Sequence, residues 1–254
     1  QHVANMLAFQ PDEQIAEVLT LKDYEVAPYL VLATRSGLVK KSRLSEYDST
    51  RSAGLIAINL REDDEVISAE LVSAEDDLLL VSQGAQALRF HADDDQLRPM
   101  GRATSGVIGM RFNEGDKLLG MYVVREGEDV LVATDGGYAK RTPADQYPLR
   151  NRGGLGVITA RIVEDRGGLV GALMVRPDDE VFAITSAGGV IRTRAGQVKQ
   201  SGRQTMGVRL MNLAPGDTVV ALARNAESES VDDTVENGVD NGVDGSADEV
   251  SGNE

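Results

Sequence analysis

Four arginines recur at nearly constant spacing in this chain, and arginine is the side chain best suited to binding phosphate groups. Arg51, Arg102, Arg152 and Arg203 are separated by 51, 50 and 51 residues, and each is followed three or four residues later by a glycine and a branched apolar residue. A guanidinium group can bind phosphate oxygens bidentately. Because the same cation recurs beside the same kind of turn, the spacing predicts a folded surface that follows a polyanion.

The same set of elements surrounds each arginine in the same order. An apolar strand leads through a turn containing glycine, at 34–37, 82–84, 134–137 and 185–189, into a second strand that carries a base. The arginine-glycine element, an acidic turn and a closing apolar strand follow. Short strands bounded by Gly, Asn and Asp are typical of all-β proteins. A period near 50 residues therefore predicts a propeller-like array of four-stranded blades. The bases expected to share one register of the second strand are Lys40, Arg89, Lys140 and Arg192.

The repeats divide the chain into two regions. Residues 1–225 contain one half repeat, at 3–20, and four full repeats. Because the chain starts at Gln1 inside a repeat, we expect it to be truncated at the N-terminus, with at least another half repeat upstream. Residues 226–254 contain ten acidic residues, no Lys or Arg and no aromatic residue. This composition predicts a disordered acidic tail, which could serve as a solubilising segment or compete with a polyanion for the bases.

The negative charge of the chain is concentrated in residues 226–254. The formal net charge is −15, and subtracting the ten acids of the tail leaves −5 for residues 1–225. A region that is not basic overall can bind a polyanion only if its bases and acids are separated in space. The repeat predicts such a separation, because the bases cluster around the second strand and the arginine-glycine element, and the acids follow at the next turn.

Few residues in this chain are suited to catalysis or metal binding. It contains no Cys and two His, which excludes thiolate chemistry and disulfides and fits a reducing cytoplasm. The glycines at 153–156 are not followed by the Lys-Ser/Thr of a phosphate-binding loop. No apolar run approaches the ~20 residues that span a bilayer. The sequence therefore predicts no catalytic site, no metal site and no cofactor in this domain, and no membrane partner.

One segment resembles the signature of a known family. Residues 149–156 read Leu-Arg-Asn-Arg-Gly-Gly-Leu-Gly, a variant of the Gln-Arg-Arg-Gly-Gly-Lys/Arg-Gly box of the C-terminal domain of the DNA gyrase A subunit. The segments at 32–41, 98–107 and 202–213 are also similar to that family, and most similar to its actinobacterial members. The segment departs from the box in two ways, because Asn151 separates the two arginines and Leu155 replaces a base. By the 50-residue period, the family's principal box would lie before Gln1.

The resemblance implies a fold and a function. Members form a six-bladed β-pinwheel whose blades exchange strands and whose rim wraps duplex DNA, in support of negative supercoiling. The domain would be a non-catalytic accessory of an ATP- and Mg²⁺-dependent type II topoisomerase. It would work in the cytoplasm at the nucleoid, together with the rest of the gyrase A subunit and with the gyrase B subunit. The related topoisomerase IV subunit, and a propeller scaffold that binds a protein partner, are the alternatives.

The residues expected to contact DNA are bases of the repeat, together with glycines of the box-like segment. The glycines would let the backbone approach phosphate, or would simply form turns. The expected DNA-binding side chains are Arg51, Arg102, Arg150, Arg152, Arg203, Lys40, Lys41, Arg89, Lys140, Arg141 and Arg192, and the glycines are Gly153, Gly154 and Gly156.

Overall fold

The computed structural model describes residues 13–50 and 54–225, and these residues form short antiparallel strands joined by turns. Arg51, the predicted acidic tail and residues 1–12 lie outside the described residues, and residues 13–20 form no strand. Helix occurs in the described ranges only as the 3-10 turns η2 (Leu44–Tyr47), η3 (Ala144–Gln146), η4 (Glu164–Arg166) and η5 (Ala195–Gln197). The strands are β1 (Tyr29–Thr34), β2 (Leu38–Arg43), β3 (Val66–Val72), β4 (Asp77–Ser82), β5 (Gln86–His91), β6 (Val107–Ile108), β7 (Leu118–Val124), β8 (Asp129–Thr134), β9 (Tyr138–Pro143), β10 (Val157–Ile158), β11 (Leu169–Val175), β12 (Glu180–Thr185), β13 (Val190–Arg194), β14 (Val208–Arg209) and β15 (Val219–Arg224).

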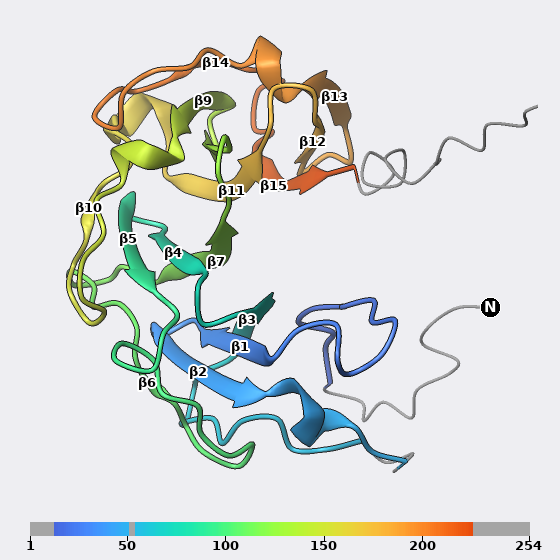
Figure 1. The fold of residues 1–254 in the computed structure, drawn as a ribbon. Helices are drawn as coiled ribbons and strands as arrows, with labels where there is room; N and C mark the ends of the chain where they lie inside the picture. The colour runs from blue at the N-terminus through green and yellow to red at the C-terminus, as the bar shows by residue number, and fades with distance from the viewer. Residues whose placement is uncertain (1–12, 51–53, 226–254) are drawn as a thin grey trace, which may run out of the picture.

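The strands form four sheets, which we call blades 1 to 4. Their strand orders are β3-β1-β2-β6, β7-β4-β5-β10, β11-β8-β9-β14 and β15-β12-β13. Figure 1 shows the blades following one another along an arc, with β3, β7, β11 and β15 in contact in series on its inner side. The predicted propeller-like array of roughly 50-residue units is confirmed, and in the described residues blade 4 has three strands.

The outermost strand of each four-stranded blade comes from the next repeat. Strand β6 belongs to the second repeat but pairs with β2 of blade 1. In the same way β10 pairs with β5, and β14 pairs with β9. The arginine-glycine elements of the second, third and fourth repeats therefore cross to the preceding blade and lie at its outer edge, as the family resemblance implied.

The glycines that follow Arg102, Arg152 and Arg203 make this crossing possible. These residues are Gly106, Gly156 and Gly207, whose φ angles are 83°, 79° and 77°. A Cβ on Gly106 would lie 2.5 Å from the carbonyl oxygen of Val39 in β2. Gly156 and Gly207 meet the equivalent carbonyls of β5 and β9. Gly156 is thus required for contact between two backbones of the protein, which favours the structural alternative for this glycine.

The hairpin turns show that the prediction of one shared base register was wrong. The left-handed residue of each turn is Gly37, Ala85, Gly137 or Gly188, with φ of 85°, 62°, 82° and 82°. The second hairpin has an alanine, Ala85, at this position. Aligning the repeats on the neighbouring Gly84 therefore displaces the second repeat by one residue. The fourth hairpin has a second glycine, Gly189, which shifts the alignment in the opposite direction.

The strand pairing shows two sets of bases instead of one. Lys40 pairs with Leu32, and Lys140 lies at the equivalent position of blade 3. Arg89 pairs with Leu79, one position further along the hairpin. The second set, at this later position, consists of Lys41, Arg89, Arg141 and Arg192. Because successive side chains of a strand point to opposite faces, the two sets lie on opposite faces of their blades.

The hydrophobic core lies between the blades. Buried residues of blades 1 and 2 form one cluster, those of blades 2 and 3 a second, and those of blades 3 and 4 a third. Leu80 in the first cluster and Leu131 in the third are fully buried. The array is therefore stabilised by contacts between neighbouring blades, as in other repeat folds.

Alanine at Gly156 should be strongly destabilising, because the left-handed conformation alone costs about 1–3 kcal/mol for such a residue and its Cβ would meet the backbone of β5. We expect Gly156→Ala to lower the free energy of unfolding by at least about 2 kcal/mol. Gly154→Ala is the matched control, since no neighbouring atom lies closer than 3.9 Å to a Cβ there. Urea denaturation measures both, and equal stabilities would contradict this role of Gly156.

Candidate nucleic-acid interface

Three segments at the outer edge of the blades carry bases and no acid. We call residues 98–111, 149–162 and 199–213 the rim loops; they contain β6, β10 and β14. Each rim loop contains three Lys or Arg and no Asp or Glu. The bases are Arg98, Arg102 and Arg111 in the first, Arg150, Arg152 and Arg161 in the second, and Lys199, Arg203 and Arg209 in the third. The rim loops therefore carry a formal charge of +9 in a chain whose net charge is −15.

The periodic arginines connect each rim segment to the one before it. Each donates its Nη1 to the carbonyl oxygen of an exposed isoleucine in the preceding repeat. The bonds are Arg102 to Ile56 (3.0 Å), Arg152 to Ile108 (3.0 Å) and Arg203 to Ile158 (2.9 Å). The three arginines are partly buried. The bonds of Arg152 and Arg203 join successive rim loops and fix the distance between them, and the bond of Arg102 joins the first rim loop to the first repeat.

Backbone hydrogen bonds reinforce this connection at a second periodic position. The amide of Arg111 donates to the carbonyl oxygen of Gly154 at 2.9 Å, and the amide of Arg161 donates to that of Thr205 at 3.0 Å. Both side chains are exposed. The rim loops thus form a continuous strip with Arg111 and Arg161 at equivalent places on its surface.

The box-like segment is held by its neighbours on one side. The carbonyl oxygen of Gln96 accepts the Nε of Arg152, and Gln96 Nε2 donates to Asn151 Oδ1 at 3.1 Å. The amide of Gly153 donates to Gly109 at 2.6 Å, so this amide already has a partner within the protein. The side chain of Arg150 is exposed.

Two of the predicted DNA contacts, Lys40 and Lys140, are buried lysines that fasten rim loops from inside. The Nζ of Lys140 donates to Gly202 at 2.8 Å and to Arg203, and that of Lys40 donates to Ala57 and Arg102, in each case to the carbonyl oxygen. Burial lowers the pKa of both ammonium groups to about 8. The structure therefore places these two side chains beneath the rim loops.

The second set of bases is paired with acids or packed inside the blades. Arg89 bonds Asp77 at 2.9 Å through Nε, and Arg141 bonds Asp129 and the carbonyl oxygen of Val198. Arg192 pairs with Glu180. The buried Lys41 pairs with Asp94 at 2.9 Å and stacks on the ring of Tyr29 at 4.5 Å. The structure brings none of these four side chains into the rim loops.

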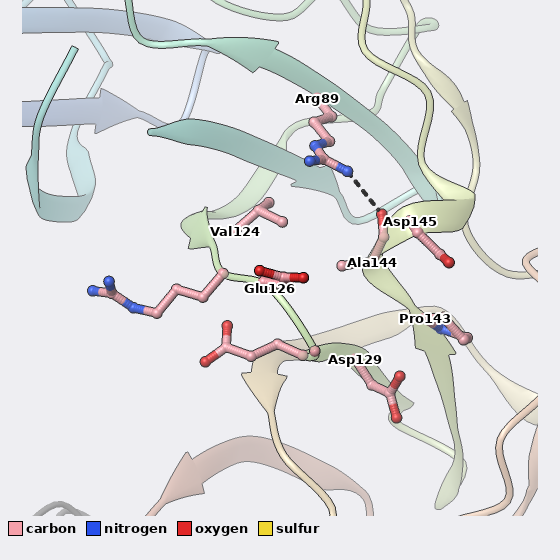
Figure 2. Close-up of a pocket in the computed structure, with 10 residues that line it drawn as sticks. Arg89, Val124, Glu126, Asp129, Pro143, Ala144 and Asp145 are labelled. Carbon is pink, nitrogen blue, oxygen red and sulfur yellow. Dashed lines mark hydrogen bonds between the residues drawn. The ribbon is translucent and has the colours of Figure 1, made fainter. Parts of the chain in front are cut away.

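Figure 2 shows that Arg89 points between two blades. Its Nη1 donates to the carbonyl oxygen of Ala144 at 3.1 Å, at the wall of a hollow of about 460 Å³. Glu126, Asp129 and Asp145 also line this hollow. Because carboxylates outnumber the two lining arginines, the hollow does not favour an anion.

The predicted DNA contacts leave out five exposed bases of the rim loops: Arg111, Arg161, Arg209, Arg98 and Lys199. The first two are 50 residues apart, so the period could have identified them, but the acids that follow them in sequence hid the signal. Arg209 takes the place of the exposed isoleucines and bonds the Tyr138 hydroxyl at 3.0 Å. Exposure, together with a place in the box-like segment or in or beside the edge strands β6, β10 and β14, therefore identifies Arg150, Arg111, Arg161 and Arg209 as the bases best placed to meet a ligand.

Two other kinds of feature are absent from the described part of the chain. It holds no group of three His, Cys, Asp or Glu side chains that could bind a metal ion. It also holds no helix long and apolar enough to cross a membrane.

Removing the Lys140 ammonium should release the third rim loop. We expect Lys140→Met to lower the free energy of unfolding by about 2–3 kcal/mol, because two carbonyl oxygens lose a charged donor. Lys199→Met, in the same loop but exposed, is the matched control and should change stability by less than about 0.5 kcal/mol. Urea denaturation of both variants tests this, and equal losses would contradict the anchoring role.

The lowered pKa of Lys140 gives a second expected result. Between about pH 8 and the ordinary value of 10.5, the unfolded chain holds a proton on this lysine that the folded chain has released. Stability rises with pH wherever the unfolded state binds more protons. The stability of the wild type relative to Lys140→Met should therefore increase from pH 8 to pH 10, and a decrease would be inconsistent with burial of the ammonium.

Comparison with known proteins agrees with this architecture. The family model described as "DNA gyrase C-terminal domain, beta-propeller" matches residues 28–73, 76–125, 128–176 and 179–225, which correspond to the four repeats. Solved structures of the C-terminal domains of DNA topoisomerase IV and of DNA gyrase A superpose with TM-scores of 0.81 and 0.79. They are 26% and 28% identical, each comparison covers 88% of this chain, and they are covered to 70% and 74%.

Relatives with higher sequence identity are DNA gyrase A subunits of actinobacteria. Those of Streptomyces coelicolor and Mycolicibacterium smegmatis are each 65% identical, over 233 and 229 residues. The matches cover 90% of this chain and 27% of each relative, so the chain spans about a quarter of their length. These relatives favour gyrase over topoisomerase IV. The chain belongs to the DNA gyrase C-terminal domain family of β-propellers.

Proposed function

We propose that this chain binds duplex DNA through the phosphate backbone and wraps it along the rim loops. One observation carries the proposal: three successive loops, each with three bases and no acid, form one continuous strip in an otherwise acidic chain. Lys and Arg contacts to phosphate provide affinity with little sequence information. The name of the related solved structure, DNA gyrase A, supports the same ligand.

The ligand contacts are divided between two kinds of arginine. The exposed Arg111, Arg150, Arg161 and Arg209 meet phosphates directly. The partly buried Arg102, Arg152 and Arg203 hold the spacing of the loops and contribute a second guanidinium nitrogen where it reaches the surface; Arg51, outside the described residues, belongs to the same series. Bending a site of 20–30 bp costs on the order of 1–6 kcal/mol, so several blades must bind together.

The proposed place of the domain in a larger enzyme follows from its relatives. It acts as the non-catalytic, DNA-wrapping part of a gyrase A subunit and supports negative supercoiling at the nucleoid in the cytoplasm. The remainder of the gyrase A subunit, together with the gyrase B subunit, then supplies the reaction that uses ATP and Mg²⁺. Residues 1–225 form the wrapping domain and 226–254 an acidic tail.

Salt dependence of DNA affinity tests the proposal. Replacing Arg111 and Arg161 together by Ala should weaken binding to a random duplex of about 40 bp at least tenfold and reduce the slope of log affinity against log salt by about 1.8. The matched control is Arg125→Ala/Arg176→Ala, which removes two exposed charges from turns outside the rim loops. A weak, flat salt response of the wild type would overturn DNA binding and favour a protein partner. Equal losses in the two double variants would overturn the assignment to the rim.

A further inference from the structure

The three rim loops are fastened differently, and the difference lies beneath the second one. The same position of the second strand holds Lys40 in blade 1, Leu88 in blade 2 and Lys140 in blade 3, paired with Leu32, Leu80 and Val132. The lysines reach the carbonyl oxygens of the loops above them. The buried side chain of Leu88 has no donor to offer. The second rim loop therefore lacks the internal anchor that the first and third possess.

A second internal tie is also missing from this loop. The Oγ1 of Thr104 donates to Gly101 at 2.9 Å, and that of Thr205 donates to Gly202 at 2.8 Å. Gly154 occupies the equivalent place in the second rim loop and has no hydroxyl. In the described part of the chain, the carbonyl oxygen of Asn151, which corresponds to Gly101 and Gly202, receives no hydrogen bond.

Where these two ties are missing, a hollow of about 610 Å³ lies beside Leu88. Its other lining residues are Arg150, Asn151, Gly154, Leu155 and Gly156. Two of these are glycines, and Gly153 in the same segment has a φ of 79°. Gly156 is packed against β5, but a Cβ on Gly153 or Gly154 would have no neighbour closer than 3.6 Å. The second rim loop thus has room beside Leu88 and, at Gly153 and Gly154, a backbone with low steric resistance to rearrangement.

We propose that Leu88 is a positioning residue for DNA: residues 151–155 are held from the side by Gln96 and the first rim loop, but Leu88 gives them no anchor from blade 2, so that they can settle toward blade 2 when a bent duplex lies across all three rim loops. The inference rests on the proposed function. Three loops at fixed spacing cannot all match the phosphates of a duplex whose curvature depends on its sequence. The middle loop, which carries Arg150 and Arg152, adjusts its position to the phosphates. The anchored loops on either side fix the path of the DNA.

Installing the missing anchor tests this role. Leu88→Lys should place an ammonium under the carbonyl oxygens of Asn151 and Arg152, and hydrogen exchange of the amides at 152–155 should slow at least about tenfold. Affinity for a duplex of about 40 bp should fall at least about threefold despite the added positive charge, which by itself would strengthen binding. Affinity for a duplex of about 12 bp, slightly more than one helical turn, should stay level or rise.

Leu88→Met, which adds no ammonium, should behave as the wild type in both measurements. Lys140→Leu makes the converse change and keeps the test decisive if Leu88→Lys does not fold. It should speed hydrogen exchange of the amides at 203–206 at least about tenfold. The exchange rates of these amides should then change when DNA binds, as we expect for the amides at 152–155 in the wild type.

Slowed exchange at 152–155 in Leu88→Lys, with unchanged affinity for the duplex of about 40 bp, would overturn the positioning role and leave the proposed function intact. So would unchanged exchange at 203–206 in Lys140→Leu. If the wild type binds neither duplex, the proposed function itself fails, and the positioning role fails with it.

Discussion

The structure depends on one close backbone contact, the approach of the arginine-glycine element of the second, third and fourth repeats to the second strand of the preceding blade. A side chain at Gly106, Gly156 or Gly207 would occupy the place of a strand carbonyl. Because this contact is made, the two-residue strands β6, β10 and β14 complete the blades before them, and the flanking bases come to the outer edge. The charge of the rim is therefore a consequence of strand exchange.

The same exchange explains why many bases of the repeat have no access to solvent. A crossing loop leaves backbone carbonyl oxygens without strand partners, and a buried carbonyl without a donor costs free energy. Lys40 and Lys140 supply donors to these oxygens. Arg102, Arg152 and Arg203 do the same for the exposed isoleucines of the neighbouring loop. A periodic base in such an array thus either donates to carbonyl oxygens of the protein or is exposed to a ligand. Only its depth in the fold distinguishes these two roles.

The sequence predicts the repeat, the order of its elements and the all-β architecture, because these depend on apolar runs and turn residues that are local in the chain. The register of the bases depends on which turn residue adopts the left-handed conformation. Ala85 does so in a position where glycine is favoured, and no local pattern predicts that choice. The burial of Lys40 and the exposure of Arg111 follow from contacts between blades, which pair residues that are 62 and 43 positions apart in the chain.

A chain with a formal charge of −15 can hold a polyanion because charge acts locally in salt solution. At physiological ionic strength the Debye length is about 8 Å, so a phosphate on the rim responds mainly to the acid-free loops beneath it. The acids of the folded part are used elsewhere: Asp64 and Asp217 accept hydrogen bonds at hairpin turns, and Asp77 and Asp129 neutralise bases within the blades. Acids paired in turns or within the blades lie outside the rim loops and leave the +9 of those loops without a neighbouring negative charge in the same segments. The acidic composition and a DNA-binding rim are therefore compatible features of one repeat.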